Sequence, residues 1–485
     1  MADDLVYSVQ ANFSMPAGSS VSQAQKLVAT GAELFGKNMM EGARMHFLAA
    51  LELEPDNVMA LQNMGAVLRS MGHFEASEIV ARRSVELDPS NPYPRANLGV
   101  AMLATKKHTE ALRIMEGITR ELPEHAPAWH NLGLTYYMLN RTAEALQAFD
   151  KAIKVNTDQG IPSPPALHSD RALALLSLAR LKEGLALYDV RWQLLAKNIL
   201  WSLPVPQWRG EPLGSDHILV HHEQGFGDGL MLSRFLKQLH EQHPAAKISL
   251  AVPQELFRLM KLSFGAVVEV LPLDDNSELL NLGRHGFNWH CPIMDLMLYV
   301  GPEKTAGIDS TPYLRAPKGE DLPTFVAGRF KIGICWASGK HGPGMEERRR
   351  IAPLVEFMKM SEIKNTSLVS LQKGPGLEQI EQLGFQGLIH NADRRLTDFA
   401  ATAAMILKMD LVVSVDSAVA HLAGALGVPT VMLSPYTRCW RWWGRDSGMP
   451  WYRNMTVFYQ KQNGSWTEAI QQATRKARLM QMGLR

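Results

Sequence analysis

The stretch His217–Leu239, with the sequence HILVHHEQGFGDGLMLSRFLKQL, decides how the second half of the chain folds. It begins as a strand-like run, ends with the apolar spacing of a helix, and has a glycine-rich loop between the two. Gln224, Gly225 and Gly227 form this loop, where glycine lets the backbone turn tightly and approach a ligand closely. The loop is not a dinucleotide fingerprint, because its third glycine stands at the wrong spacing and Asp228 would repel a pyrophosphate there. Asp228 is therefore either a helix cap or a residue that acts on a bound ligand.

Short apolar runs alternate with helical patterns on both sides of this stretch. Such alternation predicts parallel sheets built from right-handed crossovers. The runs fall into two sets, which predict two Rossmann-like lobes, at residues 196–318 and 319–485, with a hinge at 313–328 and a helix at the C-terminus. The first set is HILVHH, KISLAV, VVEVL and FNWHC, and the second set is KIGICW, SLVSL, GLIH, DLVVSV and PTVMLS.

A repeat occupies the first half of the chain. Gly31, Gly65, Gly99 and Gly133 follow one another at a spacing of 34 residues. Small residues recur twelve positions later, and proline recurs twenty-four positions later in the first three copies. This pattern predicts pairs of antiparallel helices that cross closely at the small residues and stack on their neighbours. The pattern resembles the tetratricopeptide repeat, in about five copies over residues 21–195, after a tail at residues 1–20.

Composition limits the class of protein. The chain has 485 residues, a net charge of +2 and three cysteines, Cys291, Cys335 and Cys439. Near-neutral charge argues against a protein that coats nucleic acid. Three scattered cysteines fit a reducing compartment, and no basic leader or long apolar run is present, so we expect a cytoplasmic protein without membrane insertion.

A second group of candidate residues follows the apolar run DLVVSV. Asp416, Ser417, Ala418 and His421 stand where a buried strand leads into a helix rich in small residues. Ligands bind at the carboxyl ends of parallel strands, and a helix start offers free N–H groups to an anion. The sequence therefore predicts an anion site at residues 416–421.

A third group follows the runs KIGICW and SLVSL. Hydroxyl, ammonium, guanidinium and carboxamide donors suit the oxygens of a diphosphate. The alternative is a solvated charged loop, which is equally frequent for any one of these residues. The candidates are Ser338, Lys340, Arg349, Arg350, Gln372 and Lys373.

These motifs together resemble the bacterial heptosyltransferase-type glycosyltransferases, which have a two-lobed GT-B fold. The likeness is carried by EQGFGD and VDSAVAHLAGALG and spans roughly residues 200–460. It is closest to the bacterial subgroup in which such a domain follows tetratricopeptide repeats. The segment DSGMPWY departs from the family pattern by its extra residues.

The resemblance implies a role for each group of residues. It makes Asp228 the base that activates an acceptor hydroxyl, and it makes Asp416, Ser417, Ala418 and His421 contacts of a nucleotide sugar. A lone base suggests inversion at the anomeric carbon. Because no Asp-x-Asp motif occurs, we expect neither a metal nor another cofactor.

The repeats contain a possible ladder of carboxamides. Asn63, Asn97 and Asn131 recur at the 34-residue spacing, and Asp170 takes the place in the shifted fifth copy. Carboxamides can pair with an extended peptide backbone without reading its sequence. The ladder resembles that of O-GlcNAc transferase, but asparagine is also frequent at this position in tetratricopeptide repeats generally.

Our main hypothesis is a glycosyltransferase whose repeats hold a protein acceptor at its Ser or Thr hydroxyls, with flagellin or another surface protein as a family-level expectation. A second hypothesis is a sugar-binding scaffold without turnover. A third is transfer to a lipid-linked glycan, with the repeats serving assembly. Self-association through the repeats stays open.

Overall fold

The structure, a computed structural model, describes residues 22–194, 203–273, 286–302, 307–320, 322–338, 350–442 and 450–484. Contacts between residues divide the chain into two compact units, one reaching to Leu178 and one beginning at Ala179. The predicted domain bounds stay predictions. The helix α10 (Leu181–Tyr188), which the repeat pattern assigns to the fifth copy, lies in the second unit and packs against α15 (Leu296–Tyr299).

The first unit consists of helices in antiparallel pairs, and each helix packs against the next. This confirms the predicted repeat. The helices are α1 (Gln23–Gly36), α2 (Met40–Leu53), α3 (Val58–Ser70), α4 (Phe74–Leu87), α5 (Pro92–Ala104), α6 (His108–Glu121), α7 (Ala126–Met138), α8 (Thr142–Asp158) and α9 (Pro165–Ser177).

Close helix crossings explain the periodic glycines. A Cβ atom at Gly133 would lie 2.4 Å from the ring of Phe149, and one at Gly31 would lie 2.6 Å from the ring of Phe47. Both distances are too short for a real contact, so glycine at these positions lets an aromatic side chain of the next helix fill the crossing. Gly65 differs, because its nearest neighbour is the backbone oxygen of Ser77 at 3.7 Å.

Alanine substitutions at two of these glycines should therefore have opposite effects. Gly133→Ala overpacks the α7–α8 crossing and should destabilise the unit by about 1–3 kcal/mol. Gly65→Ala has room for its methyl group and should be neutral or stabilising by up to about 1 kcal/mol, because alanine favours the helix. Thermal melting of the full chain by circular dichroism measures both. Equal melting temperatures for the two variants would contradict this explanation of the repeat.

The second unit contains two parallel sheets. The first has the strand order β3-β2-β1-β4, and every neighbouring pair is parallel. Its strands are β1 (His217–His221), β2 (Lys247–Pro253), β3 (Glu269–Leu273) and β4 (Trp289–Pro292). The accompanying helices are α11 (Phe226–Leu232), α12 (Phe235–Gln242), α13 (Gln254–Phe264) and α15, with the 3-10 turns η1 (Asp189–Leu194) and η4 (Ile293–Asp295).

The second sheet has the strand order β10-β9-β8-β5-β6-β7 and is also parallel throughout. Its strands are β5 (Phe330–Cys335), β6 (Thr366–Ser370), β7 (Ile389–Asn391), β8 (Leu411–Val415), β9 (Thr430–Ser434) and β10 (Met455–Tyr459). The helices are α17 (Leu354–Phe357), α18 (Gln379–Gln382), α19 (Phe399–Ile406), α20 (Ala418–Leu426) and α21 (Thr467–Gln481), with 3-10 turns η6 (Met358–Glu362), η7 (Asp393–Arg395) and η8 (Trp440–Trp442).

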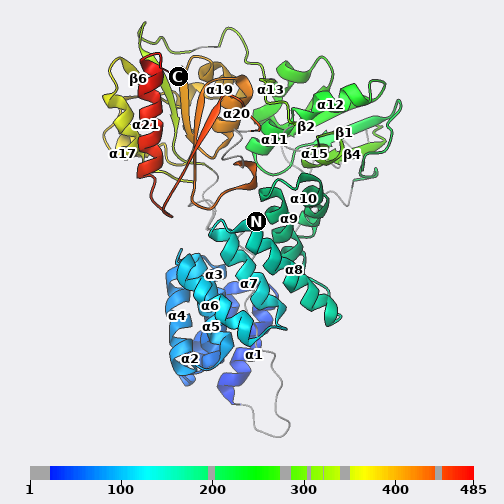
Figure 1. The fold of residues 1–485 in the computed structure, drawn as a ribbon, viewed down its shortest axis with the longest axis vertical. Helices are drawn as coiled ribbons and strands as arrows, with labels where there is room; N and C mark the ends of the chain where they lie inside the picture. The colour runs from blue at the N-terminus through cyan, green and yellow to red at the C-terminus, as the bar shows by residue number, and fades with distance from the viewer. Residues whose placement is uncertain are drawn as a thin grey trace. The chain divides into compact units, whose positions relative to one another are not determined.

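Helices cover both faces of the second sheet (Figure 1). The apolar face of α21 packs with strands β5, β6, β8 and β9 in one continuous core. On the opposite side, α19 packs against α13 and α20 packs against α11, so these two helices join the two lobes. This arrangement places the starts of α11 and α20 at the junction between the lobes.

The predicted fold class, helical repeats followed by a two-lobed α/β fold of GT-B type, is confirmed. Every predicted strand run contributes to one of the nine strands β1 to β9, and the predicted C-terminal helix is α21. Strand β10 was not predicted. No helix among the described residues is both long enough and apolar enough to cross a membrane.

Candidate active site

Asp228 lies in the first turn of α11, which a short loop connects to the carboxyl end of β1. Its Oδ2 atom accepts a hydrogen bond from the Gly225 N–H at 3.3 Å, which is the contact expected of a residue that caps the helix start. Gln224, just before this turn, has a backbone φ of 61°. This left-handed conformation is unfavourable for a residue other than glycine, and such strain collects at functional sites.

The other oxygen of Asp228 faces the second lobe. Oδ1 accepts hydrogen bonds from Arg441 Nε at 2.7 Å and from Arg441 Nη2 at 2.5 Å. Asp228 is therefore both a cap and a contact between the lobes. Burial alone would lower the pKa of Arg441, but Asp228, Cys439 and Tyr188 together outweigh it and hold that pKa well above its usual value. Sequence reasoning missed Arg441, whose only signal was its place in the aromatic segment CWRWW.

Aromatic residues hold the segment around Arg441. Trp451 donates its indole N–H to the Arg441 carbonyl oxygen at 2.7 Å, and Tyr459 donates its hydroxyl to the Trp442 carbonyl at 2.7 Å. The guanidinium of Arg441 lies 4.7 Å from the ring centre of Trp440. These backbone contacts fix η8, and the Arg441 guanidinium extends from it to Asp228.

The starts of α11 and α20 are in direct contact. A Cβ atom at Gly227 would lie 2.8 Å from Cδ2 of His421 and 3.7 Å from Cα of Ala418. Glycine at position 227 therefore permits this close approach. The structure brings together the two motifs that the sequence places in separate lobes.

Asp416 and Ser417 connect β8 to α20. Asp416 is 3% exposed, and its Oδ2 lies 3.6 Å from Nε of Arg350. Ser417 caps α20 by accepting from the Ala420 N–H at 3.4 Å, and its hydroxyl also bonds that of Ser414 at 2.8 Å. A ligand at this helix start would thus meet the backbone N–H groups beside Ala418.

His421 is buried in the first turns of α20. Its ring stacks on Trp442 with centres 4.6 Å apart, and its Nδ1 lies 2.9 Å from the Tyr452 hydroxyl. Burial lowers the pKa of His421 to about 3. The imidazole is therefore neutral near pH 7, so it brings no positive charge to a phosphate in this arrangement.

Four buried histidines of the second unit make it sensitive to acid. Burial lowers the pKa of His221 and His421 to about 3, and that of His222 and His290 to about 4. In the unfolded chain these groups titrate near pH 6.5, so the unfolded state binds more protons below that pH. Their stabilising effect is complete above pH 6.5 and is lost as the pH falls toward 4.

We expect the melting temperature to fall steeply between pH 7 and pH 5, because each of these histidines costs about 2 kcal/mol by pH 5. Burial also raises the pKa of Glu223, Asp295 and Asp170, which opposes this trend, but the four histidines outnumber these three carboxyl groups. Calorimetry of the full chain over this range measures the effect. A melting temperature that stayed constant or rose toward pH 5 would show that the histidines are protonated in the folded protein.

The candidates that follow β5 and β6 differ in their surroundings. Gln372 is 3% exposed; its Oε1 accepts from the N–H groups of Trp336 and Ala337, and its Nε2 donates to the Ala337 and Pro375 carbonyls. Its carboxamide therefore ties the ends of β5 and β6 together.

The other candidates of this group differ in exposure. Lys373 is exposed, and its Nζ lies 3.5 Å from the Asp393 carboxylate. Ser338 is half-buried at the described edge of this loop. Lys340 and Arg349 lie outside the described residues.

Comparison with known proteins identifies the domains. Residues 396–477, which include α20 and Arg441, match the family model of glycosyltransferase family 9 (heptosyltransferase). Residues 60–91 and 126–158 match models of the tetratricopeptide repeat. The chain joins tetratricopeptide repeats to a heptosyltransferase-type glycosyltransferase domain.

Similar proteins include Protein FlbA of Caulobacter vibrioides, which is 25% identical over 462 residues, covering 90% of this chain and 75% of FlbA. Among solved structures, ADP-heptose lps heptosyltransferase II of E. coli is 16% identical with a TM-score of 0.41, covering 55% of this chain and 99% of its own. A tetratricopeptide repeat protein of Thermus thermophilus is 21% identical with a TM-score of 0.33, covering 36% of this chain and 93% of its own.

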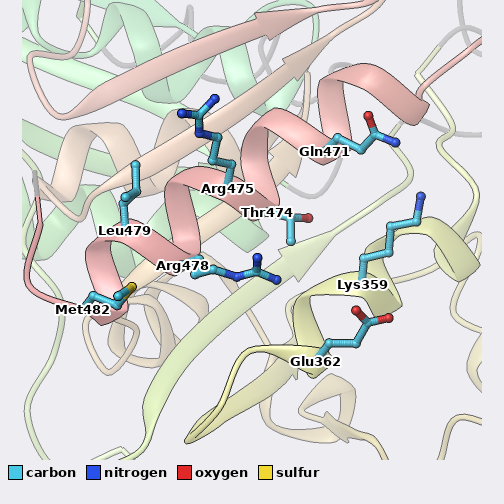
Figure 2. A pocket seen from close by; sticks show the side chains of 8 residues that line it. All are labelled: Lys359, Glu362, Gln471, Thr474, Arg475, Arg478, Leu479 and Met482. Atoms are coloured by element: carbon cyan, nitrogen blue, oxygen red, sulfur yellow. The ribbon is translucent and has the colours of Figure 1, made fainter.

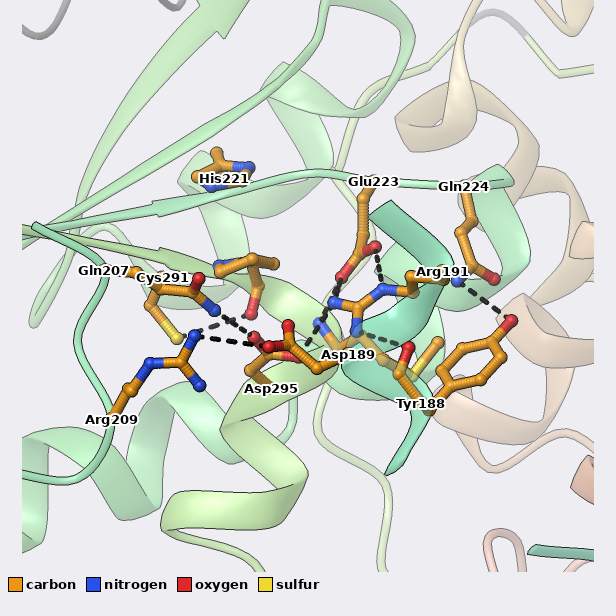
Figure 3. Close-up of polar contacts among 12 residues, drawn as sticks. Tyr188, Asp189, Arg191, Gln207, Arg209, His221, Glu223, Gln224, Cys291 and Asp295 are labelled. Atoms are coloured by element: carbon orange, nitrogen blue, oxygen red, sulfur yellow. Dashed lines mark hydrogen bonds and ion pairs between the residues drawn. The ribbon is translucent and has the colours of Figure 1, made fainter. Parts of the chain in front are cut away.

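A buried ion cluster adjoins the loop between β1 and α11 (Figure 3). Arg191 of η1 donates to both carboxylate oxygens of Glu223 at 2.9 Å and to Asp295 at 2.8 Å. All three side chains are less than 10% exposed. Glu223 also accepts from the Met294 N–H at 3.2 Å, and Gln207 donates to Asp295 at 2.8 Å. Glu223 thereby anchors the residue next to Gln224.

A second contact reaches the same loop. Gln224 donates to the Tyr188 hydroxyl at 3.4 Å (Figure 3). Its Oε1 accepts from Arg441 Nη2 at 3.3 Å. Burial raises the pKa of Tyr188 to about 12, so this hydroxyl stays protonated. Polar contacts from α10 and from η8 therefore meet at the strained residue before α11.

The carboxamide ladder differs from one repeat to the next. Asn63 is half-buried, Asn97 is 9% exposed and Asn131 is 0% exposed. Asp170, at the same position of the fifth copy, is buried and bonds Nε2 of His130 at 2.7 Å. Asn131 is thus not open to an external peptide in this structure, whereas Asn63 is the most accessible of the three.

A separate pocket lies on the outer side of the second lobe (Figure 2). It has a volume of about 550 Å³ and is formed by α21 and η6. Its lining includes no residue of the predicted site and consists of Lys359, Glu362, Gln471, Thr474, Arg475, Arg478, Leu479 and Met482. Among the described residues, no group of three His, Cys, Asp or Glu side chains is placed to hold a metal ion.

Proposed function

We propose that this glycosyltransferase moves a sugar from a nucleotide-sugar donor to a Ser or Thr hydroxyl of a protein, with inversion and with Asp228 as the base. The observation that supports it most is the position of Asp228. It stands at the carboxyl end of a parallel strand, 2.5 Å from Arg441 of the other lobe and beside the start of α20. Ligands of open parallel sheets bind at such strand ends.

The proposed chemistry follows from this position. The nucleotide sugar lies with its diphosphate toward the N–H groups at the start of α20 and its anomeric carbon toward Asp228. Asp228 takes the proton of the acceptor hydroxyl as its oxygen attacks the anomeric carbon. The attack comes from the face opposite the leaving diphosphate, so the product has the opposite anomeric configuration. The proposal involves no bound metal.

The repeats support a protein as the acceptor. Stacked tetratricopeptide repeats offer an extended concave surface suited to a peptide. Asn63, half-buried, is the ladder residue best able to pair with a peptide backbone, and Asn97 is next. Peptide binding by Asn131 stays a prediction. It requires this buried side chain to change its position before a peptide could reach it.

A transfer assay tests the proposal. The purified protein is mixed with radiolabelled ADP-, CDP-, GDP- and UDP-linked sugars and with a bacterial extract that contains flagellin, with and without EDTA. We expect label in the protein fraction, released by β-elimination as expected for Ser and Thr glycosides, and unchanged by EDTA. Intact-mass and fragment spectra identify the modified residues.

Three results would contradict parts of the proposal separately. Label recovered only in an organic extract would favour a lipid-linked acceptor. Donor binding without transfer to any fraction would favour a scaffold without turnover. Retained anomeric configuration in the product, read by NMR, would rule out a single displacement with Asp228 as its base.

A further inference from the structure

The carboxylate of Asp228 is already occupied in this structure. Its Oδ1 accepts two charge-assisted hydrogen bonds from one guanidinium, at 2.5 and 2.7 Å, and its Oδ2 accepts the N–H of Gly225. Hydrogen bonds of this kind are the strongest that a carboxylate makes. A base held in this way is a poor acceptor for the proton of an incoming hydroxyl, so something must draw Arg441 away before the reaction.

The other described partners of Arg441, which include the Trp440 ring 4.7 Å from its guanidinium, carry no negative charge. Its Nη1 lies 3.1 Å from the Cys439 sulfur and its Nη2 lies 3.3 Å from Gln224 Oε1, and both partners are uncharged acceptors. Sulfur is a weak acceptor. Asp228 therefore supplies the negative charge among these three contacts. A second anion nearby would compete with Asp228 for the guanidinium.

The donor diphosphate would be such an anion. In a displacement at the anomeric carbon, the attacking oxygen, the carbon and the leaving oxygen lie in line, which puts the leaving oxygen within about 7 Å of the base. The guanidinium has donors on two edges and can face both groups or move from one to the other. The adjoining start of α20 offers N–H groups to the same anion.

We infer that Arg441 is a catalytic residue that passes from the Asp228 carboxylate to the leaving diphosphate when the donor binds. The inference rests on the proposed function, because it takes Asp228 as the base. In the reaction, the bond from the acceptor oxygen to the anomeric carbon forms, and the bond from that carbon to the phosphate oxygen breaks. The acceptor proton goes to Asp228, and the electron pair leaves with the diphosphate, whose added charge Arg441 stabilises.

This arrangement requires the donor to bind before the acceptor can react. Without the diphosphate, Arg441 neutralises the base, so water and acceptor hydroxyls are not activated. With the diphosphate present, the same side chain stabilises the leaving group and leaves Asp228 free. One side chain would thus link occupation of the donor site to activity of the base.

A double-mutant cycle tests the inference by measuring only the binding of nucleoside diphosphates. Affinities of wild type, Asp228→Asn, Arg441→Gln and the double variant for ADP, CDP, GDP and UDP are measured by isothermal titration calorimetry. Asp228→Asn removes the competitor for Arg441, so the best-binding diphosphate should bind about tenfold more tightly. Arg441→Gln should bind it at least about tenfold more weakly. In the Arg441→Gln background, Asp228→Asn should have no effect.

The cycle separates an exchange of Arg441 from general electrostatics. If Asp228→Asn strengthens binding equally in both backgrounds, the gain is charge removal alone and the inference is wrong. It is equally wrong if Asp228→Asn leaves the affinity unchanged. Arg475→Gln, an exposed arginine of α21, is the matched control and should bind like wild type.

Failure of the proposed function has a different signature. If no protein of the set binds any of the four diphosphates, the donor site itself is absent and both proposals fall. If the cycle behaves as expected but no sugar is transferred, the exchange of Arg441 stands and the assignment of turnover is wrong.

Discussion

Asp228→Asn is expected to lower the turnover number for sugar transfer at least about 100-fold, because asparagine cannot take the acceptor's proton. The substitution keeps the size of the side chain and its carbonyl oxygen, so the contact with the Gly225 N–H that caps α11 can remain. The α11–α20 junction should therefore persist, and nucleoside diphosphate binding should not weaken. Initial rates at saturating donor and acceptor, with binding measured on the same preparations, give both quantities.

The control is Asp216→Asn, which changes a carboxylate at the opposite end of β1. Asp216 accepts from the indole N–H of Trp289 at 2.8 Å, and an asparagine oxygen can keep that contact. This variant should transfer sugar at close to the wild-type rate. If Asp228→Asn retained more than about a tenth of wild-type turnover, Asp228 would be a structural cap and not the base.

Arg191→Met is expected to lower the free energy of unfolding by about 3–5 kcal/mol, because it leaves Glu223 and Asp295 buried without their shared cation. The segment from Gln224 to Asp228 follows Glu223 directly, so any protein that folds should also have reduced turnover. Calorimetry of the full chain at neutral pH measures the loss of stability through the melting temperature.

Two comparison variants make the Arg191 prediction specific. Combining Arg191→Met with Glu223→Gln and Asp295→Asn removes the unpaired charges and should recover a large part of the stability. Lys237→Met breaks the ion pair between Lys237 and Glu241, whose side chains are 74% and 59% exposed. It should lower the free energy of unfolding by less than about 1 kcal/mol. An Arg191→Met protein that melts like wild type would show that the buried cluster contributes little.

Much of the fold could be predicted because local patterns encode it. The 34-residue spacing of glycines reflects the helix crossings at Gly31 and Gly133, where an added Cβ atom would collide with a phenylalanine. The runs KIGICW and DLVVSV are almost continuously apolar because β5 and β8 are buried between helices on both faces. Strand β10 was missed, because it lies at the sheet edge and is mostly half-buried.

The ion pairs of the site could not be predicted in the same way. Arg441 and Asp228 are 213 positions apart, and Arg191 and Asp295 are 104 positions apart. These residues come close only when the two lobes and η1 pack together. The spacing of residues within a short stretch of sequence does not indicate such packing. The resemblance to heptosyltransferase-type enzymes pointed to Asp228 and to the start of α20 but not to Arg441.

Burial also decides what individual predicted residues can do. The carboxamide of Gln372 is taken up by five backbone contacts in the loops after β5 and β6, so its geometry is that of a loop support. His421 is enclosed by Trp442 and Tyr452. A sequence shows that such residues follow a strand, but it does not show which of their polar atoms the protein itself uses.

Hydrogen exchange of the full-length protein with and without its best-binding nucleoside diphosphate tests the central claim most directly, which is that the α11–α20 junction is the donor site. We predict slower exchange of backbone amides in two segments from different lobes, residues 224–232 and 416–426, with little change in the repeats. Protection confined to the outer pocket between η6 and α21, or no protection at either helix start, would contradict the claim.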